Sequence, residues 1–358
     1  MTREKTTTVL ITGLGAPGAP GIIKSLRLNG ERDLKIVGVD SAADDASGAG
    51  MVNAVYSVPI ARDPMFIDSL LSICREEKVD VVIPLVTAEL PVLADAIGRF
   101  EREGIKVQVS SPESLGNANN KFALMSFCGQ RGIPVPEFRL VRSREEFEKK
   151  AFELGYPDRK ICFKPPVSNG MRGFRVIDDT SERMEKLIYE KPDNVYIGYE
   201  EFLQIADDAD FFPELLLMEY LPGEEYSVDV LVENGNYIAS IPRSREKIKM
   251  GISFVGVAVN DEEIMEYSRM VVEALGLHGN IGLQFRRDAA GVPKLIESNP
   301  RVQGTIVLCT AAGYNMVYNS VKLALGEPLP TFDPKWGTKM VRYWEEIFFD
   351  RNGKGFRL

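Results

Sequence analysis

The chain has 358 residues, of which 44% are hydrophobic and 27% charged, a balance typical of a soluble globular protein with two or three subdomains. Its net charge of -9 argues against non-specific binding to nucleic acid or to an anionic membrane surface. The sequence contains neither an apolar run long enough to span a bilayer nor the apolar core and cleavage site of a signal peptide, so we expect a cytoplasmic protein.

The cysteine and histidine content further limits the kinds of catalytic and metal site that we expect in this chain. The four cysteines have no C-x-x-C spacing, so the sequence indicates neither a zinc site nor a redox motif. The single histidine, His278, leaves little room for Ser-His-Asp, Cys-His or His-rich metal chemistry. We expect reduced and mostly buried thiols.

The first part of the chain alternates strands with helices. Alternation of this kind predicts a parallel sheet covered on both faces. The expected strands lie at 7–13, 34–40, 79–85 and 105–110, and the expected helices at 20–30, 62–78 and 89–104.

The pattern of expected strands and helices changes near residues 115–120, where the central part begins. Lys121 opens a helix, residues 160–178 read as strand, loop and strand, a helix is expected at 181–191, and a strand is expected at 214–221. This pattern predicts a small α+β lid over about 120–218.

From Tyr226 onward the sequence is rich in strands. The expected elements are a hairpin turning at 234–236, a helix that begins at Asp261, a second hairpin over 280–300, a closing helix over 304–326 and an added strand within 340–350.

A glycine loop follows the first strand. Gly13, Gly15 and Gly18 form G-x-G-x-x-G, and Asp40 ends the next strand 22 residues later. This is the dinucleotide fingerprint, in which glycines admit the pyrophosphate and an acid holds a ribose hydroxyl. An NAD(P)-dependent oxidoreductase is therefore one hypothesis, and a tight strand-to-helix turn without a ligand is the other.

Two further segments have residues suited to a nucleotide. Lys164 ends a strand before a loop rich in Ser, Asn and Gly, whose backbone N–H groups can cradle phosphates. A strand then runs into Glu219, bends at Pro222 and Gly223, and continues at Glu225. For the Lys164 segment the alternative is a flexible hairpin whose lysine extends its ammonium group to solvent. For the segment after Glu219 the alternative is a solvated acidic turn.

The stretch "LIESNPR" places Glu297, Asn299 and Arg301 at the end of an apolar strand. Residues two apart in an extended chain face the same side, and carboxylate and amide oxygens are ligands that Mg²⁺ accepts. The alternative is a polar turn that closes the strand.

Lys121, Lys164 with its loop, "MEYLPGEEYSVDV", Gln284 and "LIESNPR" together resemble the ATP-grasp superfamily in order and spacing. The likeness spans about residues 1–330 and is strongest to a single ATP-grasp module of the carbamoyl phosphate synthase large subunit and to biotin carboxylase-like ligases. It implies an α/β plus α+β architecture, in which a Rossmann-like parallel sheet domain precedes a two-part ATP-grasp fold. The expected domains are 1–118, 119–218 (the small lid subdomain) and 219–358 (the catalytic subdomain with a short tail).

The resemblance also implies roles for individual residues. Lys121 and Lys164 would contact the ATP phosphates, and the loop from Ser168 through Asn169 and Gly170 to Gly173 would close over them. Glu219, Tyr220 and Leu221 would contact the adenine, and Glu225 would bind the ribose. The metal would be held by Gln284, Glu297 and Asn299, and Arg301 would face the transferring phosphoryl group. Many members of the superfamily have a carboxylate where Gln284 stands, so the site would have one negative charge fewer.

Candidates for the substrate side come from the residues themselves. Arg243 and Arg245 belong to a local basic cluster in an acidic protein, and we expect one of them to orient the substrate acid or its acyl phosphate. The alternative is a solvated basic loop. Thr87 and Glu89 follow a parallel strand, where ligands bind in such sheets, although we favour helix capping for both.

We therefore expect a ligase that depends on ATP and Mg²⁺, with Mn²⁺ as an alternative metal. It would activate a small carboxylic acid as an acyl phosphate for attack by an amine, ammonia or a thiol. Carbamoyl phosphate synthesis itself is not expected, because this chain contains neither a second ATP-grasp half nor an ammonia-delivering partner. The competing hypotheses are the oxidoreductase and a non-catalytic nucleotide sensor. The expected partners are the small-molecule substrates and, by analogy with the family, a second copy in a homodimer.

Overall fold

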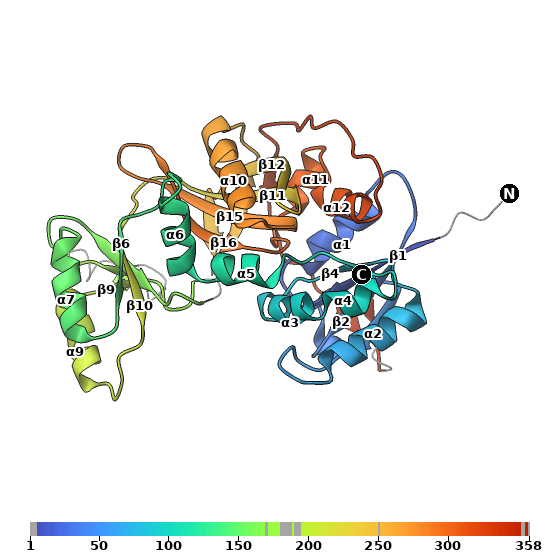
Figure 1. Ribbon diagram of the computed structural model, residues 1–358, viewed down its shortest axis with the longest axis horizontal. Coiled ribbons are helices and arrows are strands. Elements are labelled where there is room, and N and C mark those ends of the chain that lie inside the picture. The colour runs from blue at the N-terminus through green and yellow to red at the C-terminus, as the bar shows by residue number, and fades with distance from the viewer. Residues whose placement is uncertain are drawn as a thin grey trace. The chain divides into compact units, whose positions relative to one another are not determined.

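The computed structural model of the chain describes residues 6–168, 171–179, 188–189, 195–249, 251–351 and 355–356 (Figure 1). The chain forms two compact units. Unit 1 comprises Met1–Ala118, Glu225–Gln284 and Ser298–Leu358, and unit 2 comprises Asn119–Glu224 and Phe285–Glu297. The division into three domains expected from the sequence stays a prediction.

Unit 1 begins with a five-stranded parallel sheet in the order β3-β2-β1-β4-β5, as the alternating pattern predicted. Its strands β1 and β2 pair over six residues, from Thr7 with Leu34 to Thr12 with Val39. The chain crosses from one side of β1 to the other between β3 and β4, which creates a topological switch point beside β1. The strands are β1 (Thr7–Thr12), β2 (Leu34–Asp40), β3 (Ala54–Ser57), β4 (Val81–Ile83) and β5 (Lys106–Val107).

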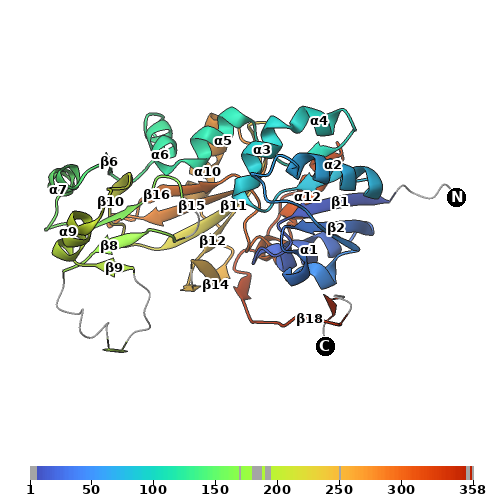
Figure 2. The same ribbon diagram turned by 90° about the horizontal axis from the view of Figure 1, so that it is seen from below.

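Helices cover both faces of this sheet (Figure 2). Helix α1 (Ala19–Arg27) packs on one face, and α2 (Phe66–Glu77) packs on the other with α3 (Leu90–Asp95) and α4 (Ile97–Glu101). The single helix expected over 89–104 is wrong, because the backbone leaves helical geometry at Ala96 and restarts as α4. A further helix, α5 (Pro112–Asn119), follows β5.

Unit 1 continues with a hairpin of β11 (Glu225–Glu233) and β12 (Asn236–Ser244). Asn234 and Gly235 both have positive φ, as the "NGN" turn predicted. Helix α10 (Glu262–Leu275) follows, and its N-cap Asp261 accepts a hydrogen bond from the Ile264 backbone N–H at 3.1 Å. Both the hairpin and this capped helix are confirmed.

The remaining strands complete the sheet of β11 and β12 and form two further sheets. Strands β15 (Gly279–Arg287) and β16 (Pro293–Asn299) complete the order β12-β11-β15-β16. A three-stranded sheet contains β13 (Lys247–Lys249), β14 (Ile252–Val257) and β17 (Lys339–Val341). The strand expected within 340–350 is therefore short, and a separate pair of β18 (Phe348–Phe349) and β19 (Gly355–Phe356) follows it.

The closing helix expected over 304–326 is two helices in the structure, α11 (Val307–Ala311) and α12 (Met316–Ala324). Gly313, with φ +95°, reverses the chain between them, and the Asn315 side chain caps α12 by accepting from the Tyr318 N–H at 3.1 Å. None of the helices within the described residues is long and apolar enough to cross a membrane.

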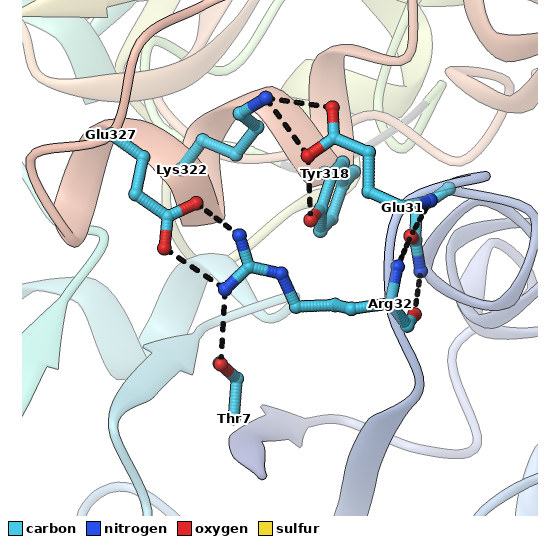
Figure 3. A network of polar contacts seen from close by, with 7 residues as sticks. Thr7, Glu31, Arg32, Tyr318, Lys322 and Glu327 are labelled. Carbon is cyan, nitrogen blue, oxygen red and sulfur yellow. Dashed lines mark hydrogen bonds and ion pairs between the residues drawn. The ribbon is translucent and has the colours of Figure 1, made fainter. Parts of the chain in front are cut away.

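Helix α12 is also joined to the turn after α1 by a polar network within unit 1 (Figure 3). Lys322 Nζ donates to both carboxylate oxygens of Glu31 at 2.7 and 2.9 Å. Arg32 forms a two-point ion pair with Glu327 just beyond α12, and it also donates to Thr7 Oγ1 at 3.4 Å. These contacts fix the N-terminal sheet to the C-terminal helix of the same unit.

Unit 2 contains a five-stranded sheet in the order β6-β10-β7-β8-β9, with helices on both faces. Alternate residues of its strands point to opposite sides, so Leu217 packs with α7 and α9 whereas Leu216 packs with α6. The helix expected over 181–191 lies outside the described residues apart from 188 and 189. The elements are α6 (Lys121–Gly129), β6 (Phe138–Val141), α7 (Arg144–Glu153), β7 (Ile161–Lys164), β8 (Arg175–Ile177), β9 (Tyr196–Ile197), α9 (Tyr199–Asp208) and β10 (Leu215–Glu219).

Candidate active site

In unit 2, Lys121 is buried at the first turn of α6 and reaches the end of β16. Asn120 begins the helix by accepting from the Ala123 N–H at 3.1 Å. The Lys121 ammonium then donates to the Ser168 carbonyl at 2.8 Å and lies 3.8 Å from Glu297 Oε2. A predicted phosphate lysine thus stands beside a predicted metal ligand.

Lys164, the second predicted phosphate lysine, reaches the same stretch of unit 2. It is the last residue of β7, and its ammonium donates to the Ile296 carbonyl at 3.1 Å. Both lysines are buried, with 3% and 7% of their surface exposed. Two ammonium groups next to one strand end suit an anionic ligand such as a chain of phosphates.

The loop after Lys164 lies partly outside the described residues. Ser168 is described and receives the hydrogen bonds of Lys121, whereas the predicted loop residues Asn169 and Gly170 lie outside. Gly173 has φ +74°, and a Cβ there would lie 2.5 Å from Pro165 Cδ. Glycine at position 173 is therefore required by the fold of the loop, whatever the loop binds.

Glu219, expected to contribute to the adenine hinge, lies buried at the end of β10 in unit 2. Its carboxylate accepts from the Glu137 N–H at 3.0 Å and pairs with Arg159 at 2.8 Å and with Lys294. Burial would lower the pKa of Lys294, but the hydrogen bond and charge of Glu219 outweigh it and raise the pKa. The side chain of Glu219 is thus a structural anchor, and contact between this residue and adenine stays a prediction.

The sequence patterns did not point to Arg159 and Lys294, because they lie 60 and 75 residues from Glu219. The available signal was a lysine at 294 directly before the apolar residues Leu295 and Ile296 of the strand. Tyr220 and Leu221 follow in the same bend, with the guanidinium of Arg286 at 5.2 Å from the Tyr220 ring centre and Leu221 buried.

In unit 1, Arg301 follows β16 and is oriented by its neighbours. Its Nε donates to Thr87 Oγ1 at 3.0 Å, and its Nη1 donates to the Val302 carbonyl at 2.9 Å. The other predicted metal ligands of this unit, Gln284 and Asn299, are half-buried on β15 and at the end of β16. Thr87 therefore positions Arg301, and the expected capping role of Thr87 is wrong, because its helix has no side-chain cap.

Glu225 and Arg245, also in unit 1, form an ion pair with one another. Arg245 donates further to Ser253 Oγ at 3.0 Å and to the Gly251 carbonyl at 2.7 Å. The predicted ribose acid is thus the partner of a predicted substrate residue, so a ligand that binds one must compete with or extend this pair.

Arg243 lies in the interior of unit 1, with 2% of its surface exposed. Its Nε lies 2.7 Å from Asp229 Oδ2, and its other nitrogens donate to Gln303 Oε1 at 2.8 Å and to the Thr305 hydroxyl. A guanidinium so engaged anchors the segment after Arg301. Direct contact between Arg243 and a substrate stays a prediction.

The glycine loop of unit 1 is packed by the protein itself. A Cβ on Gly13 would lie 2.5 Å from Val86 Cγ2, and one on Gly18 would lie 2.4 Å from Gly304 Cα. The Asp40 carboxylate accepts from the Gly15 N–H at 2.8 Å. The positive φ of +62° with the close Val86 side chain at Gly13, and the close Gly304 backbone at Gly18, thus explain both end glycines without a dinucleotide.

Glu89 lies beside this loop, at the carboxyl ends of β1 and β4. It is buried and accepts a hydrogen bond from the Thr12 hydroxyl. Burial raises the pKa of Glu89 to about 7, and the charge of Asp40 adds to the rise against the hydrogen bond of Thr12. The expected capping role of Glu89 is wrong, because its side chain makes no cap of α3.

Metal binding by the described residues would rest on amide as well as carboxylate oxygens. No group of three or more His, Cys, Asp and Glu side chains within the described ranges could hold a metal ion. The predicted set of Gln284, Glu297 and Asn299 has one carboxylate and two amides, and hard oxygen ligands of this kind suit Mg²⁺ when phosphate oxygens complete its shell.

Comparisons with known proteins define the class of protein. Residues 211–346 match the family model described as "ATP-grasp in the biosynthetic pathway with Ter operon". Residues 9–108 match the one described as "PylC-like, N-terminal domain". The chain therefore has an ATP-grasp domain preceded by a PylC-like N-terminal domain, and the resemblance seen in its motifs is confirmed.

The relatives agree with this class. The carbamoyl phosphate synthase large chain of Thermus thermophilus is 26% identical over 279 residues, which are 75% of this chain and 25% of that protein. The chain thus spans about a quarter of the length of that relative.

Two solved structures share the fold. An ADP complex of N5-carboxyaminoimidazole ribonucleotide synthetase is 18% identical, with a TM-score of 0.67 over 93% of this chain and 81% of that one. A biotin carboxylase from Campylobacter jejuni in a β,γ-ATP complex is 18% identical, with a TM-score of 0.66 over 91% and 72%. The expected parallel-sheet domain followed by an ATP-grasp fold is confirmed.

Proposed function

We propose that this protein is a ligase that depends on ATP and Mg²⁺, with Mn²⁺ as an alternative metal, and that it activates a small carboxylic acid as an acyl phosphate. The observation that carries the proposal is the pair of buried lysines, Lys121 and Lys164, at the end of β16 beside Glu297. Two buried cations beside the Glu297 carboxylate favour a highly charged anionic ligand over a neutral one.

The chain's own residues would then divide the binding of the nucleotide. Lys121 and Lys164 offset phosphate charge, and the loop from Ser168 to Gly173 covers the phosphates. The bend at Glu219, Tyr220 and Leu221 offers backbone groups to the adenine, and Glu225 accepts the ribose hydroxyls. Arg301, already oriented by Thr87, faces the transferring phosphoryl group.

Gln284, Glu297 and Asn299 would hold the metal, which supplies positive charge to the phosphate oxygens. In the first step a substrate carboxylate oxygen attacks the γ-phosphorus, the bond to the β–γ bridging oxygen breaks, and ADP leaves. In the second step an amine, ammonia or thiol attacks the acyl carbon, loses its proton, and displaces phosphate. Phosphoryl transfer needs positioning and charge more than an acid–base residue, which suits a chain with one histidine.

The proposal includes a cytoplasmic location and small-molecule partners, with a homodimer as the expected assembly. All four cysteines are buried free thiols, consistent with a reducing compartment. An amide-forming reaction fits the class of carboxylate–amine ligases to which the relatives belong.

The test is ADP release from ATP and Mg²⁺ across a panel of amino acids and other small acids, with and without added amines. Acid-dependent release supports the ligase, whereas nucleotide binding without release under any combination supports a sensor.

A thermal-shift comparison separates the ligase from an oxidoreductase. Saturating ATP–Mg²⁺ at about 100 times its Kd should stabilise the fold by about 2.7 kcal/mol. Stabilisation by NAD(P) in place of ATP would overturn the proposal. The packed state of the glycine loop favours the first outcome.

A further inference from the structure

Arg342, which no motif singled out, follows β17 in the C-terminal segment of unit 1. Its backbone N–H donates to the Phe254 carbonyl at 2.8 Å, which continues the pairing of β17 with β14. Its side chain turns inward and donates through Nη2 to the Gly304 carbonyl. The neighbours Val341 and Tyr343 are exposed, so Arg342 is the inward-facing residue of this stretch.

The electrostatic surroundings of Arg342 are unbalanced. Burial first, and the charge of Arg243 second, lower the pKa of Arg342. Arg243 itself is paired with the carboxylate of Asp229 at 2.7 Å. Within the described residues Arg342 has no ion pair, so no carboxylate of these residues balances its charge, and the nearby charge of Arg243 has the same sign.

Arg342 also has unused hydrogen-bonding capacity. A guanidinium has five N–H donors in a planar fork that matches a carboxylate. Within the described part of the chain, the side chain of Arg342 makes a single hydrogen bond, to Gly304. An anion bound here would therefore gain charge-assisted hydrogen bonds and relieve the repulsion between the two arginines.

The position of Gly304 connects Arg342 to the ligand-binding edge of unit 1. Gly304 lies three residues after Arg301, and its backbone is packed against Gly18 so closely that neither position admits a Cβ without displacement. Gly18 is the N-cap of α1, whose first turn has no acidic residue and no side-chain cap, so its positive end is uncompensated. This is the carboxyl edge of the parallel sheet, where ligands of such folds bind.

We propose that Arg342 binds a carboxylate of the acid substrate at this edge of unit 1. The proposal rests on the proposed ligase function for the identity of its ligand. A carboxylate is preferred to a phosphate because the buried lysines of unit 2 already serve the nucleotide phosphates in that function. Arg342 is thus a determinant of acid recognition supplied by the C-terminal segment.

The experiment follows the unfolding temperature of the full chain against sodium acetate, sodium succinate and sodium phosphate, with sodium chloride holding ionic strength constant. The variants are Arg342→Met and Arg342→Lys, with Lys339→Met as the matched control. Lys339 lies in the same segment, but it is exposed and paired with Glu246. The anion-free unfolding temperature of each variant is measured first, which separates a fold defect from a binding defect.

We expect a saturable rise with acetate or succinate in the wild type and in Lys339→Met, a reduced rise in Arg342→Lys, and its loss in Arg342→Met. An unchanged rise in Arg342→Met, a wild-type rise no larger than in chloride, or a response to phosphate alone would each overturn the proposal. ATP–Mg²⁺ titrations of the same variants report separately on the ligase function. A retained ATP response with a lost carboxylate response isolates Arg342, and a missing ATP response in the wild type counts against the ligase alone.

Discussion

The glycine loop after β1 and the polar end of β16 both follow a buried strand, and both match a nucleotide-binding pattern, yet the fold treats them differently. Each region contains a carboxylate with less than a tenth of its surface exposed, Glu89 beside the loop and Glu297 in β16. Glu89 is held by the hydroxyl of Thr12, whereas Glu297 faces the ammonium of Lys121. The regions thus differ in the charge of the partner and not in burial.

This difference shows how to separate a ligand site from a scaffold when motifs look alike. The glycine loop is filled by Val86, Gly304 and the loop's own bond to Asp40, so its spacing is already explained by packing. At the end of β16, the buried ammonium groups of Lys121 and Lys164 lie beside the Glu297 carboxylate and the Ile296 carbonyl. A motif whose spacing is explained by packing within the protein is interpreted as a scaffold. A motif at which charged side chains cluster is interpreted as a candidate ligand site.

Of the substitutions considered, Glu297→Ala at the polar end of β16 should have the largest effect, a loss of ADP release. Without this carboxylate the proposed metal set retains only amides, and we expect ADP release to fall by about 100-fold or more. Initial rates of ADP release with an active acid measure the effect, and the unfolding temperature reports on the fold. Glu113→Gln, an exposed acid in the first turn of α5, is the control. Activity retained in a folded Glu297→Ala would remove the metal assignment.

The substitution Glu89→Gln should reveal how the buried carboxylate beside the glycine loop makes stability depend on pH. The pKa of Glu89 is about 7 in the folded state, whereas the unfolded state loses the proton near the ordinary glutamate value of 4.5. Because the unfolded chain binds fewer protons in that window, wild-type stability falls as pH rises through it.

Glutamine has no carboxyl group to titrate, so the variant does not lose this stability as pH rises. Its free energy of unfolding should therefore rise relative to that of the wild type, by up to about 3 kcal/mol above pH 7. Urea unfolding at several pH values measures the difference. An equal stability gap at pH 4.5 and pH 8 would show that the carboxylate of Glu89 is not the titrating group.

The substitution Gly18→Ala tests whether the glycine loop is a scaffold. A Cβ 2.4 Å from the Gly304 backbone forces one segment to move, and we expect a loss of about 1–3 kcal/mol in the free energy of unfolding. Gly116→Ala, in helix α5 with nothing within 4 Å of the new Cβ, should instead be neutral or stabilising by up to about 1 kcal/mol. Denaturant unfolding compares the two, and equal effects would contradict close packing at Gly18.

Local features of the fold were predictable from the sequence because their causes are local. Strand–helix alternation gave the parallel sheet, and Asp261 marked the start of α10. The break at Gly313 was missed because apolar periodicity continues on both sides of it. Spacing also singled out Glu297, Asn299 and Arg301, which are near neighbours in the chain, and their joint role in one site stays a prediction.

Contacts between residues that are far apart in the chain could not be predicted from the sequence. Asp229 neutralises Arg243 from the paired strand β11, and Gly304 receives the side chain of Arg342 from 38 residues further along the chain. No pattern marked these pairs, because each depends on how whole elements pack. The sequence therefore predicted Arg243 as a substrate residue while giving no signal for Arg342.

The smallest effect is expected in the network between the turn after α1 and α12, where opposite charges meet without any excess of one sign (Figure 3). Arg32 and Glu327 keep 32% and 27% of their side-chain surface exposed, so water screens much of their attraction. Arg32→Met should lower the free energy of unfolding by about 1 kcal/mol or less, and added salt should shrink the difference. A double-mutant cycle with Glu327→Gln, run at low and high salt, measures the coupling. If Arg32→Met changed ADP release while Glu297→Ala did not, charge excess would no longer distinguish the ligand site from the scaffold.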